Sequence, residues 1–185
     1  MYEELQRALD VVSTGDFYRC LTGFAKSELA VDVEWVVRYS PFTAPVLLHC
    51  AKRPEVPTSV DLDMVNKLYD GGFYKLDPWL RYWTSFRTPG LVTAENLPTH
   101  LAKDDFYSAL KPFLGDKDVI AMFLPAYGGN SITIFLEREE RFSHEEGDRL
   151  REIYPLIQSL HKVHIQALMT QAWLGAPAAK ESLLQ

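Results

Sequence analysis

Asp77 is the residue whose type and surroundings best suit the binding of a small molecule. It lies in a 22-residue stretch, 69–90, of which seven residues are aromatic. Large rings around one carboxylate are typical of a mostly apolar ligand pocket with few polar anchors. The same rings also form ordinary hydrophobic cores, and aromatic content by itself favours the core.

The Asp77-Pro78 pair predicts the start of a helix, because Asp is a common N-cap residue and Pro is common at the first helical position. A helix that begins there places Trp79 and Trp83 one turn apart on the same face. Capping alone would satisfy the Asp77 carboxylate, so cap and ligand contact are alternatives that can also coexist through different oxygens. Each indole N–H needs a partner when buried, either a ligand or a backbone carbonyl.

Other pairs that could carry chemistry lack the partners that it requires. His161 and His164 have no third metal ligand at a matching spacing, which indicates a surface or core pair. Cys50 and His49 are neighbours on a predicted strand and point to opposite faces, so they cannot act as nucleophile and base. No GxSxG, phosphate-loop or HExxH motif is present. We therefore expect no enzyme activity, no metal and no cofactor.

Composition limits the classes of partner. The chain has 185 residues, 47% of them hydrophobic, and a net charge of −6, which fits one globular domain. The acidic balance and the lack of a Lys/Arg cluster predict no direct nucleic-acid binding. Cys20 and Cys50 lie far apart and indicate buried thiols in a reducing compartment. No apolar run reaches the length of a membrane span, so we expect no membrane contact and a cytoplasmic protein.

Hydrophobic periodicity predicts the elements that must position these residues. The expected helices cover 2–12, 16–29 with Asp16 as cap, 60–70, a segment from Pro78, 99–114, and 143–173 with Ser143 and Glu146 as a capping box. The expected strands lie in 31–40, 45–51, 91–97, 118–127 and 130–139, the last two joined by a hairpin-type connection at 128–130. The mixed-charge run 137–141 is most simply a solvated turn.

This order of elements predicts an α+β domain, with a central antiparallel sheet of about five strands and helices on its faces. The order of the strands in the sheet does not follow from the sequence. We expect a ligand-sensing and dimerisation domain over 1–173, and a linker or disordered tail over 174–185.

Several segments occur in an order that resembles a known family. They are FYKLDPWLRYW, TPGLV, FYSAL, AMFLPAYGG with ITIFLE, and FSHEEGDRL. Over residues 15–165 the chain resembles the N-terminal sensory domains of LuxR-type transcriptional regulators, in a branch that is GAF-like and divergent from the acyl-homoserine-lactone receptors. The resemblance implies a GAF/PAS-like α/β/α sandwich that binds a small ligand between sheet and helices. It also implies a homodimer and a downstream helix-turn-helix domain, which is not present before Gln185.

The resemblance also assigns roles to individual residues. Asp77 matches an aspartate whose carboxylate accepts a hydrogen bond from the ligand amide, and Thr133 matches a hydroxyl residue that faces the pocket. The Trp and Tyr that grip the lactone do not reappear on the helix before Asp77, where only Tyr69 is near, so the ligand class stays open. The candidate ligand-binding residues are Asp77, Trp79, Trp83, Tyr74, Tyr69, Phe106, Phe123 and Thr133.

The sequence is compatible with two functions. The first is a non-enzymatic sensor in which an apolar or amphipathic ligand shifts the population of helix arrangements and so controls DNA binding elsewhere. The second is a ligand-independent dimerisation or protein-interaction module that modulates a full-length regulator, with the aromatic cluster as a closed core. The apolar stripe of the last helix continues through Leu168, Met169 and Trp173 and predicts a helix–helix seam of a homodimer.

Overall fold

A five-stranded antiparallel sheet forms the central layer of the fold. Residues 1–27, 29–55, 62–101, 108–109 and 117–175 are described by the structure, a computed structural model of the chain. The strands are β1 (Val33–Tyr39), β2 (Val46–Lys52), β3 (Gly90–Thr93), β4 (Asp118–Pro125) and β5 (Ser131–Arg138). Their order in the sheet is β2-β1-β5-β4-β3, with antiparallel neighbours throughout.

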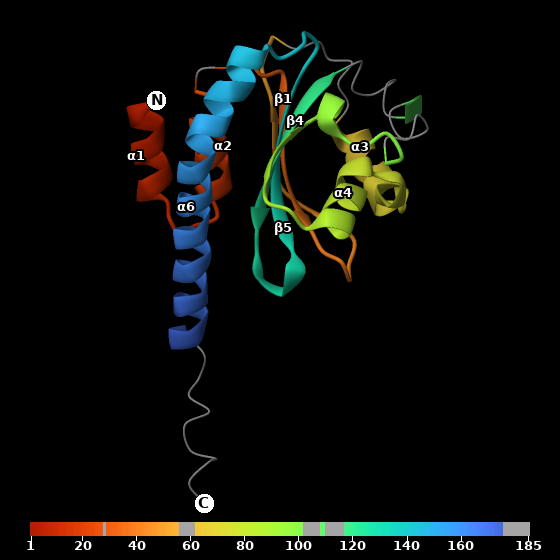
Figure 1. Cartoon of the computed structure of the whole chain (residues 1–185). Helices are drawn as coiled ribbons and strands as arrows, with labels where there is room; N and C mark the ends of the chain where they lie inside the picture. Colours follow the sequence, from red (N-terminus) through yellow and green to blue (C-terminus); the bar gives the residue numbers. More distant parts are fainter. Residues whose placement is uncertain (28, 56–61, 102–107, 110–116, 176–185) are drawn as a thin grey trace, which may run out of the picture.

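Helices cover both faces of this sheet (Figure 1). On one side α2 (Phe17–Ala25) and the long α6 (His144–Gly175) cover the sheet, and α1 (Tyr2–Asp10) packs against α2; α3 (Leu62–Asp70) and α4 (Pro78–Phe86) lie on the other side. The short helices are η1 (Phe73–Leu76), η2 (Ala94–Asn96) and η3 (Tyr127–Gly129). The predicted α+β sandwich, with a central antiparallel sheet of about five strands flanked by helices, is confirmed.

The sheet separates two cores of different character. The aromatic face, which α3 and α4 cover, carries Trp35, Tyr39, Phe123 and Phe135. The aliphatic face, which α2 and α6 cover, consists mainly of Ile, Leu, Val and Met side chains of β1, β4 and β5. Because successive strand residues point to opposite faces, a strand between two helical layers must be apolar at nearly every position. Six of the seven residues of β1 are buried, and only Arg38 is exposed.

Most predicted elements are present, and two local interpretations were wrong. The capping box of α6 is confirmed, since the Glu146 N–H donates to Ser143 Oγ (3.2 Å) and the Ser143 N–H donates to Glu146 Oε2 (2.8 Å). Asp16 does not cap α2 with its side chain, because its carboxylate accepts from Arg19 Nε instead (3.2 Å). The run 137–141 is not simply a solvated turn, because its first two residues belong to β5 and Arg138 is buried.

Most of the helix expected over 99–114, including Phe106, lies outside the described residues, as does 176–185. The last helix continues to Gly175, two residues beyond the predicted end. Among the described helices, none combines the length and apolar character that a membrane crossing requires.

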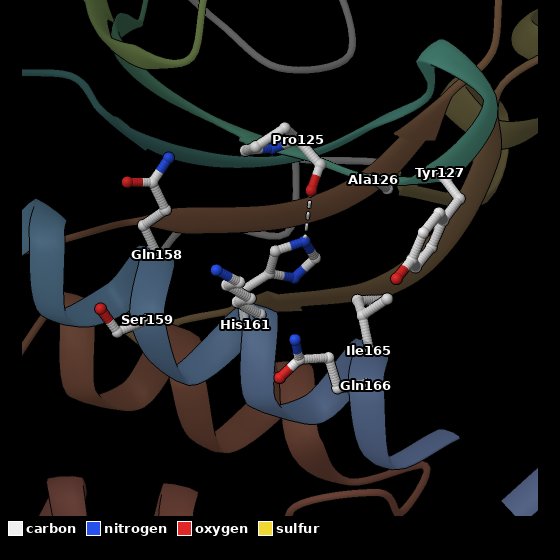
Figure 2. Close-up of a pocket in the computed structure, with 9 residues that line it drawn as sticks. Pro125, Ala126, Tyr127, Gln158, Ser159, His161, Ile165 and Gln166 are labelled. Carbon is white, nitrogen blue, oxygen red and sulfur yellow. Dashed lines mark hydrogen bonds between the residues drawn. The ribbon is translucent and has the colours of Figure 1, made fainter. Parts of the chain in front are cut away.

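The histidine pair of α6 is part of the core, which confirms one of the two predicted alternatives. His161 and His164 are 1% and 2% exposed. His161 Nε2 donates to the carbonyl of Pro125 at 3.0 Å (Figure 2), and the N–H of Ser13 donates to His164 Nδ1, also at 3.0 Å. The His164 ring stacks on Phe17 with centroids 3.9 Å apart. Burial, and then the neighbouring His161, lowers the pKa of His164 to about 4.

This pKa predicts a loss of stability in mild acid. Unfolded His164 takes up a proton near pH 6.5, whereas the folded ring resists protonation, so stability is complete above pH 6.5 and falls between pH 6.5 and 4. The difference between the folded and unfolded pKa values of His164 corresponds to at most about 3 kcal/mol in the free energy of unfolding. Urea unfolding at pH 7.0 and 4.5 should show this fall, and His164→Phe should reduce it. The exposed His144→Gln is the control; an unchanged pH dependence in His164→Phe contradicts the assignment.

Candidate ligand-binding site

The carboxylate of Asp77 is fully buried between the aromatic face and α4. Its Oδ1 accepts the backbone N–H of Trp79 at 2.8 Å, which is the predicted N-cap. Its Oδ2 accepts the hydroxyls of Tyr39 at 2.5 Å and Tyr69 at 2.8 Å. One oxygen therefore caps the helix, and the other joins β1 to the end of α3.

The electrostatics of Asp77 reflect a balance between burial and hydrogen bonding. Burial raises the pKa of the carboxyl, whereas the hydroxyls of Tyr39 and Tyr69 and the backbone donors at the start of α4 lower it. The net direction is upward, because removal from water outweighs the neutral donors. A carboxyl in this setting favours a neutral or hydrogen-bond-donating neighbour over an anion.

Tyr39 is a partner of Asp77 that the sequence did not identify. The sequence predicts that it shares a strand face with Trp35, and both are indeed buried. Its contact with Asp77 depends on how β1 sits opposite α4, which no local pattern encodes. Tyr74, the third ring expected around the carboxylate, is instead half-buried on η1 and lies outside the buried aromatic cluster.

The two tryptophans of α4 occupy one buried face, as predicted. Trp79 and Trp83 are 4% and 3% exposed. Trp83 Nε1 donates to the carbonyl of Gly129 at 2.9 Å, so the backbone alternative applies to this indole. Trp79 packs its ring edge-on against Phe135, with centroids 5.7 Å apart. Trp83 stacks on Phe123 at 5.9 Å.

Phe123 and Thr133 complete the part of the candidate set that lies on the sheet. Both are fully buried and directly opposite one another on β4 and β5. The Thr133 hydroxyl lies 3.1 Å from Ser131 Oγ, which in turn donates to the carbonyl of Leu124 at 3.3 Å. The structure thus brings together Asp77, Tyr69, Trp79, Trp83, Phe123 and Thr133 on one side of the sheet, whereas Phe106 lies outside the described residues.

Glu137 is a second buried carboxyl on the same face, and the sequence interpretation missed it. It lies opposite Val33 of β1 and follows Phe135 by two positions, so its side chain belongs to the aromatic face. The residue is partly exposed overall, but its Oε2 atom is buried. Burial raises its pKa to about 7, the Trp35 indole and the Lys117 charge lower it, and the Asp77 charge adds to the rise. The alternation of β5, continued to residue 138, was the signal that could have revealed it.

The neighbours His49 and Cys50 on β2 have different surroundings. His49 pairs with Glu34 at 3.0 Å, while Cys50 packs on the aromatic face, so the two neighbours do point to opposite faces. Among the described residues, no group of three or more His, Cys, Asp and Glu side chains could hold a metal ion.

A separate groove lies on the other side of the sheet. It has a volume of about 540 Å³ and runs between the end of β4 and α6 (Figure 2). Its lining includes Tyr127, Gln158, Lys162 and Gln166. None of the candidate ligand-binding residues lines it, so it is distinct from the site at Asp77.

Comparison with known proteins identifies the fold. No family model matches the chain, and no curated protein matches it. Among solved structures, the ligand-binding domain of VqsR from Pseudomonas aeruginosa is similar, with 19% identity, a TM-score of 0.70, and coverage of 89% of this chain and 95% of that chain. CepR2 from Burkholderia cenocepacia is 14% identical with a TM-score of 0.63, over 91% of this chain and 97% of its own.

GAF domains have the same architecture. The GAF domain/HD domain protein from Geobacter sulfurreducens is 12% identical with a TM-score of 0.55, over 88% of this chain and 98% of that chain. The fold is therefore the one that GAF domains and the ligand-binding domains of LuxR-family regulators share.

The hydrogen bonds to Asp77 predict a graded loss of stability. Tyr39→Phe leaves a buried carboxylate oxygen short of a donor, which costs about 1–2 kcal/mol. Tyr69→Phe should cost less, because Tyr69 is only half-buried. Urea unfolding of both single variants and of each combined with Asp77→Asn measures the coupling. Tyr127→Phe on the exposed hairpin is the control; full additivity of Tyr39→Phe with Asp77→Asn contradicts the proposed coupling.

The pKa of Glu137 predicts a loss of stability as the pH rises from mildly acidic to neutral. The folded state retains a proton up to about pH 7, whereas the unfolded carboxyl loses it near pH 4.5, so stability falls as the pH rises from 4.5 to 7. Glu137→Gln should therefore be more stable than wild type at pH 8, by up to about 3 kcal/mol, and similar to it at pH 5. The exposed Glu139→Gln serves as control. Equal stabilities of wild type and Glu137→Gln at pH 8 would falsify the assignment.

Proposed function

We propose that this chain is a small-molecule-sensing regulatory domain of a LuxR-type transcription regulator. An apolar or amphipathic ligand binds between the aromatic face and the helices α3 and α4, and its binding controls a DNA-binding unit. The observation that carries the proposal is the fully buried Asp77 carboxylate, held by the hydroxyls of Tyr39 and Tyr69 among large apolar rings. Such an anchor on an apolar wall fixes the orientation of a ligand that has one hydrogen-bond donor.

The similar structures support this proposal through their known roles. CepR2 is an N-acylhomoserine-lactone-dependent LuxR-family transcription factor, and the VqsR structure is a ligand-binding domain. A role of this kind would place the chain in the cytoplasm, as a regulatory domain without catalysis. Its net charge of −6 suits a domain that does not itself contact DNA.

A physical connection from the aromatic face to α6 supports control at a distance. The Phe123 side chain stacks on Trp83, and its backbone carbonyl accepts the hydroxyl of Tyr154 on α6 at 2.7 Å. A ligand that repositions α4 against Phe123 therefore acts on a residue that α6 also holds. The ligand shifts the equilibrium between helix arrangements by the difference between its affinities for them.

Ligand binding is tested by thermal shift with a metabolite panel and by native mass spectrometry of protein purified from a bacterial host. We expect a co-purified or added compound to stabilise the wild type, and Asp77→Asn and Trp79→Ala to abolish the shift. Trp79→Phe retains the packing if Trp79→Ala unfolds, and Tyr127→Phe is the control. A fold that stays intact while no compound shifts its melting temperature contradicts the proposal.

A ligand-independent dimerisation module is the second candidate. The apolar side chains of Val163, Met169, Trp173 and Leu174 on α6 are 49%, 48%, 77% and 71% exposed, which favours burial against a second copy. A homodimer fits the sensor as well, so ligand dependence separates the two functions. Sedimentation at micromolar concentration should show a dimer, and Trp173→Ser should raise its dissociation constant at least tenfold. If the wild type is a monomer, the helix–helix seam on α6 is wrong for both functions.

A further inference from the structure

Trp35 and Glu137 present two buried polar atoms that the protein itself does not satisfy. Neither Trp35 Nε1 nor Glu137 Oε2 has a hydrogen-bond partner among the residues that the structure describes. A hydrogen-bond interaction with the Trp35 indole lowers the pKa of the Glu137 carboxyl, but this contact lacks full hydrogen-bond geometry and leaves both atoms incompletely satisfied. An unpaired buried donor or acceptor is costly, and native proteins rarely keep one without a use for it.

The strand register places both atoms on the aromatic face. Trp35 of β1 lies opposite Phe135 of β5, and Glu137 lies opposite Val33, so Trp35 and Glu137 are diagonal neighbours. Phe135, two positions before Glu137 on the same face of β5, contacts Trp79 at 5.7 Å and Tyr39 at 6.1 Å between ring centroids. The face therefore has polar groups at two places with an aromatic surface between them.

The cation that acts on Glu137 already has a partner of its own. Lys117, whose charge lowers the pKa of the Glu137 carboxyl, donates its Nζ to Asp32 Oδ2 at 3.1 Å. Trp35 Nε1 can only donate a hydrogen bond, whereas a carboxyl oxygen accepts one. The pair thus matches a group that accepts from the indole and donates to the carboxyl. A neutral group meets this requirement with a smaller desolvation cost than an ion.

We propose that Trp35 and Glu137 form a second polar subsite, which binds a ligand group with a carbonyl acceptor beside an N–H donor, such as a carboxamide. The carbonyl accepts from Trp35 Nε1, the N–H donates to Glu137 Oε2, and the apolar body of the ligand lies against Phe135. The inference rests on the proposed ligand site of this face and narrows the class of ligand. It adds an anchor that is distinct from Asp77.

A pair of matched probes tests the subsite. Decanamide has both the acceptor and the donor, whereas N,N-dimethyldecanamide has the acceptor alone. Titrations followed by ¹H–¹⁵N NMR of the tryptophan indoles give both affinities, with the Trp35 signal assigned from Trp35→Phe. We expect decanamide to bind the wild type about five- to tenfold more tightly than its dimethyl analogue, the value of one buried hydrogen bond. Both probes should move the Trp35 signal.

Variants decide which carboxyl recognises the amide. Glu137→Met should abolish the preference for decanamide, while Glu137→Gln, which keeps an acceptor, should retain it. Trp35→Phe should weaken both probes together, and Tyr127→Phe on the exposed hairpin should leave their ratio unchanged. If Glu137→Met retains the preference for decanamide, another group recognises the amide N–H; the subsite is then wrong and the proposed function stands.

Two further outcomes overturn the subsite. Equal affinities of the two probes for the wild type exclude an N–H donor to Glu137, whether or not the ligand site exists. If neither probe binds at millimolar concentration but the metabolite panel yields a stabilising compound, the carboxamide class of ligand is rejected and the proposed sensor function is not. Failure of the probes and of the panel together rejects the proposed function and the subsite with it.

Discussion

The antiparallel pairing of β1 with β5 is the interaction on which the rest of this fold depends. It joins a hairpin near the start of the chain to a hairpin near its end, and so makes one sheet from two local units. Because β1 and β5 then lie inside the sheet, their side chains are buried on both faces, and each face needs its own layer of helices. The three-layer architecture follows from this one long-range contact.

The same pairing creates the candidate site. It sets Tyr39 and Trp35 beside Phe135, and α4 then brings Trp79 and the Asp77 carboxylate against them. Asp77 caps α4 with one carboxylate oxygen. Its other oxygen accepts hydrogen bonds from Tyr39 of β1 and Tyr69 of α3, so this side chain stabilises the helical layer beside which we propose that the ligand binds. The side chain that we propose as the ligand anchor therefore also has a structural role.

The errors of sequence interpretation have physical causes. Asp16 has the right type for an N-cap, but Arg19 one turn later competes for its carboxylate. Charged residues 137–141 are typical of a solvated turn, yet β5 continues through Arg138, whose guanidinium binds Glu146 in bidentate fashion at 2.7 and 2.6 Å. Glu137 is carried onto the aromatic face by this extension. The charge pattern alone could not show that Arg138 has a tertiary partner in Glu146, whereas the next residue, Glu139, is exposed.

The sequence by itself determined the local structure: strand alternation, the Asp77-Pro78 helix start, the Ser143–Glu146 capping box and the common face of Trp79 and Trp83. These features depend on residues within one or two turns of each other, so their patterns are visible in the chain. Only the tertiary structure decided the strand order, the tyrosine partners of Asp77, the burial of the histidine pair, and the unpaired polar atoms of Trp35 and Glu137. Each of these depends on segments that meet across the sheet, and burial there sets hydrogen-bond partners and pKa values that spacing along the chain does not encode.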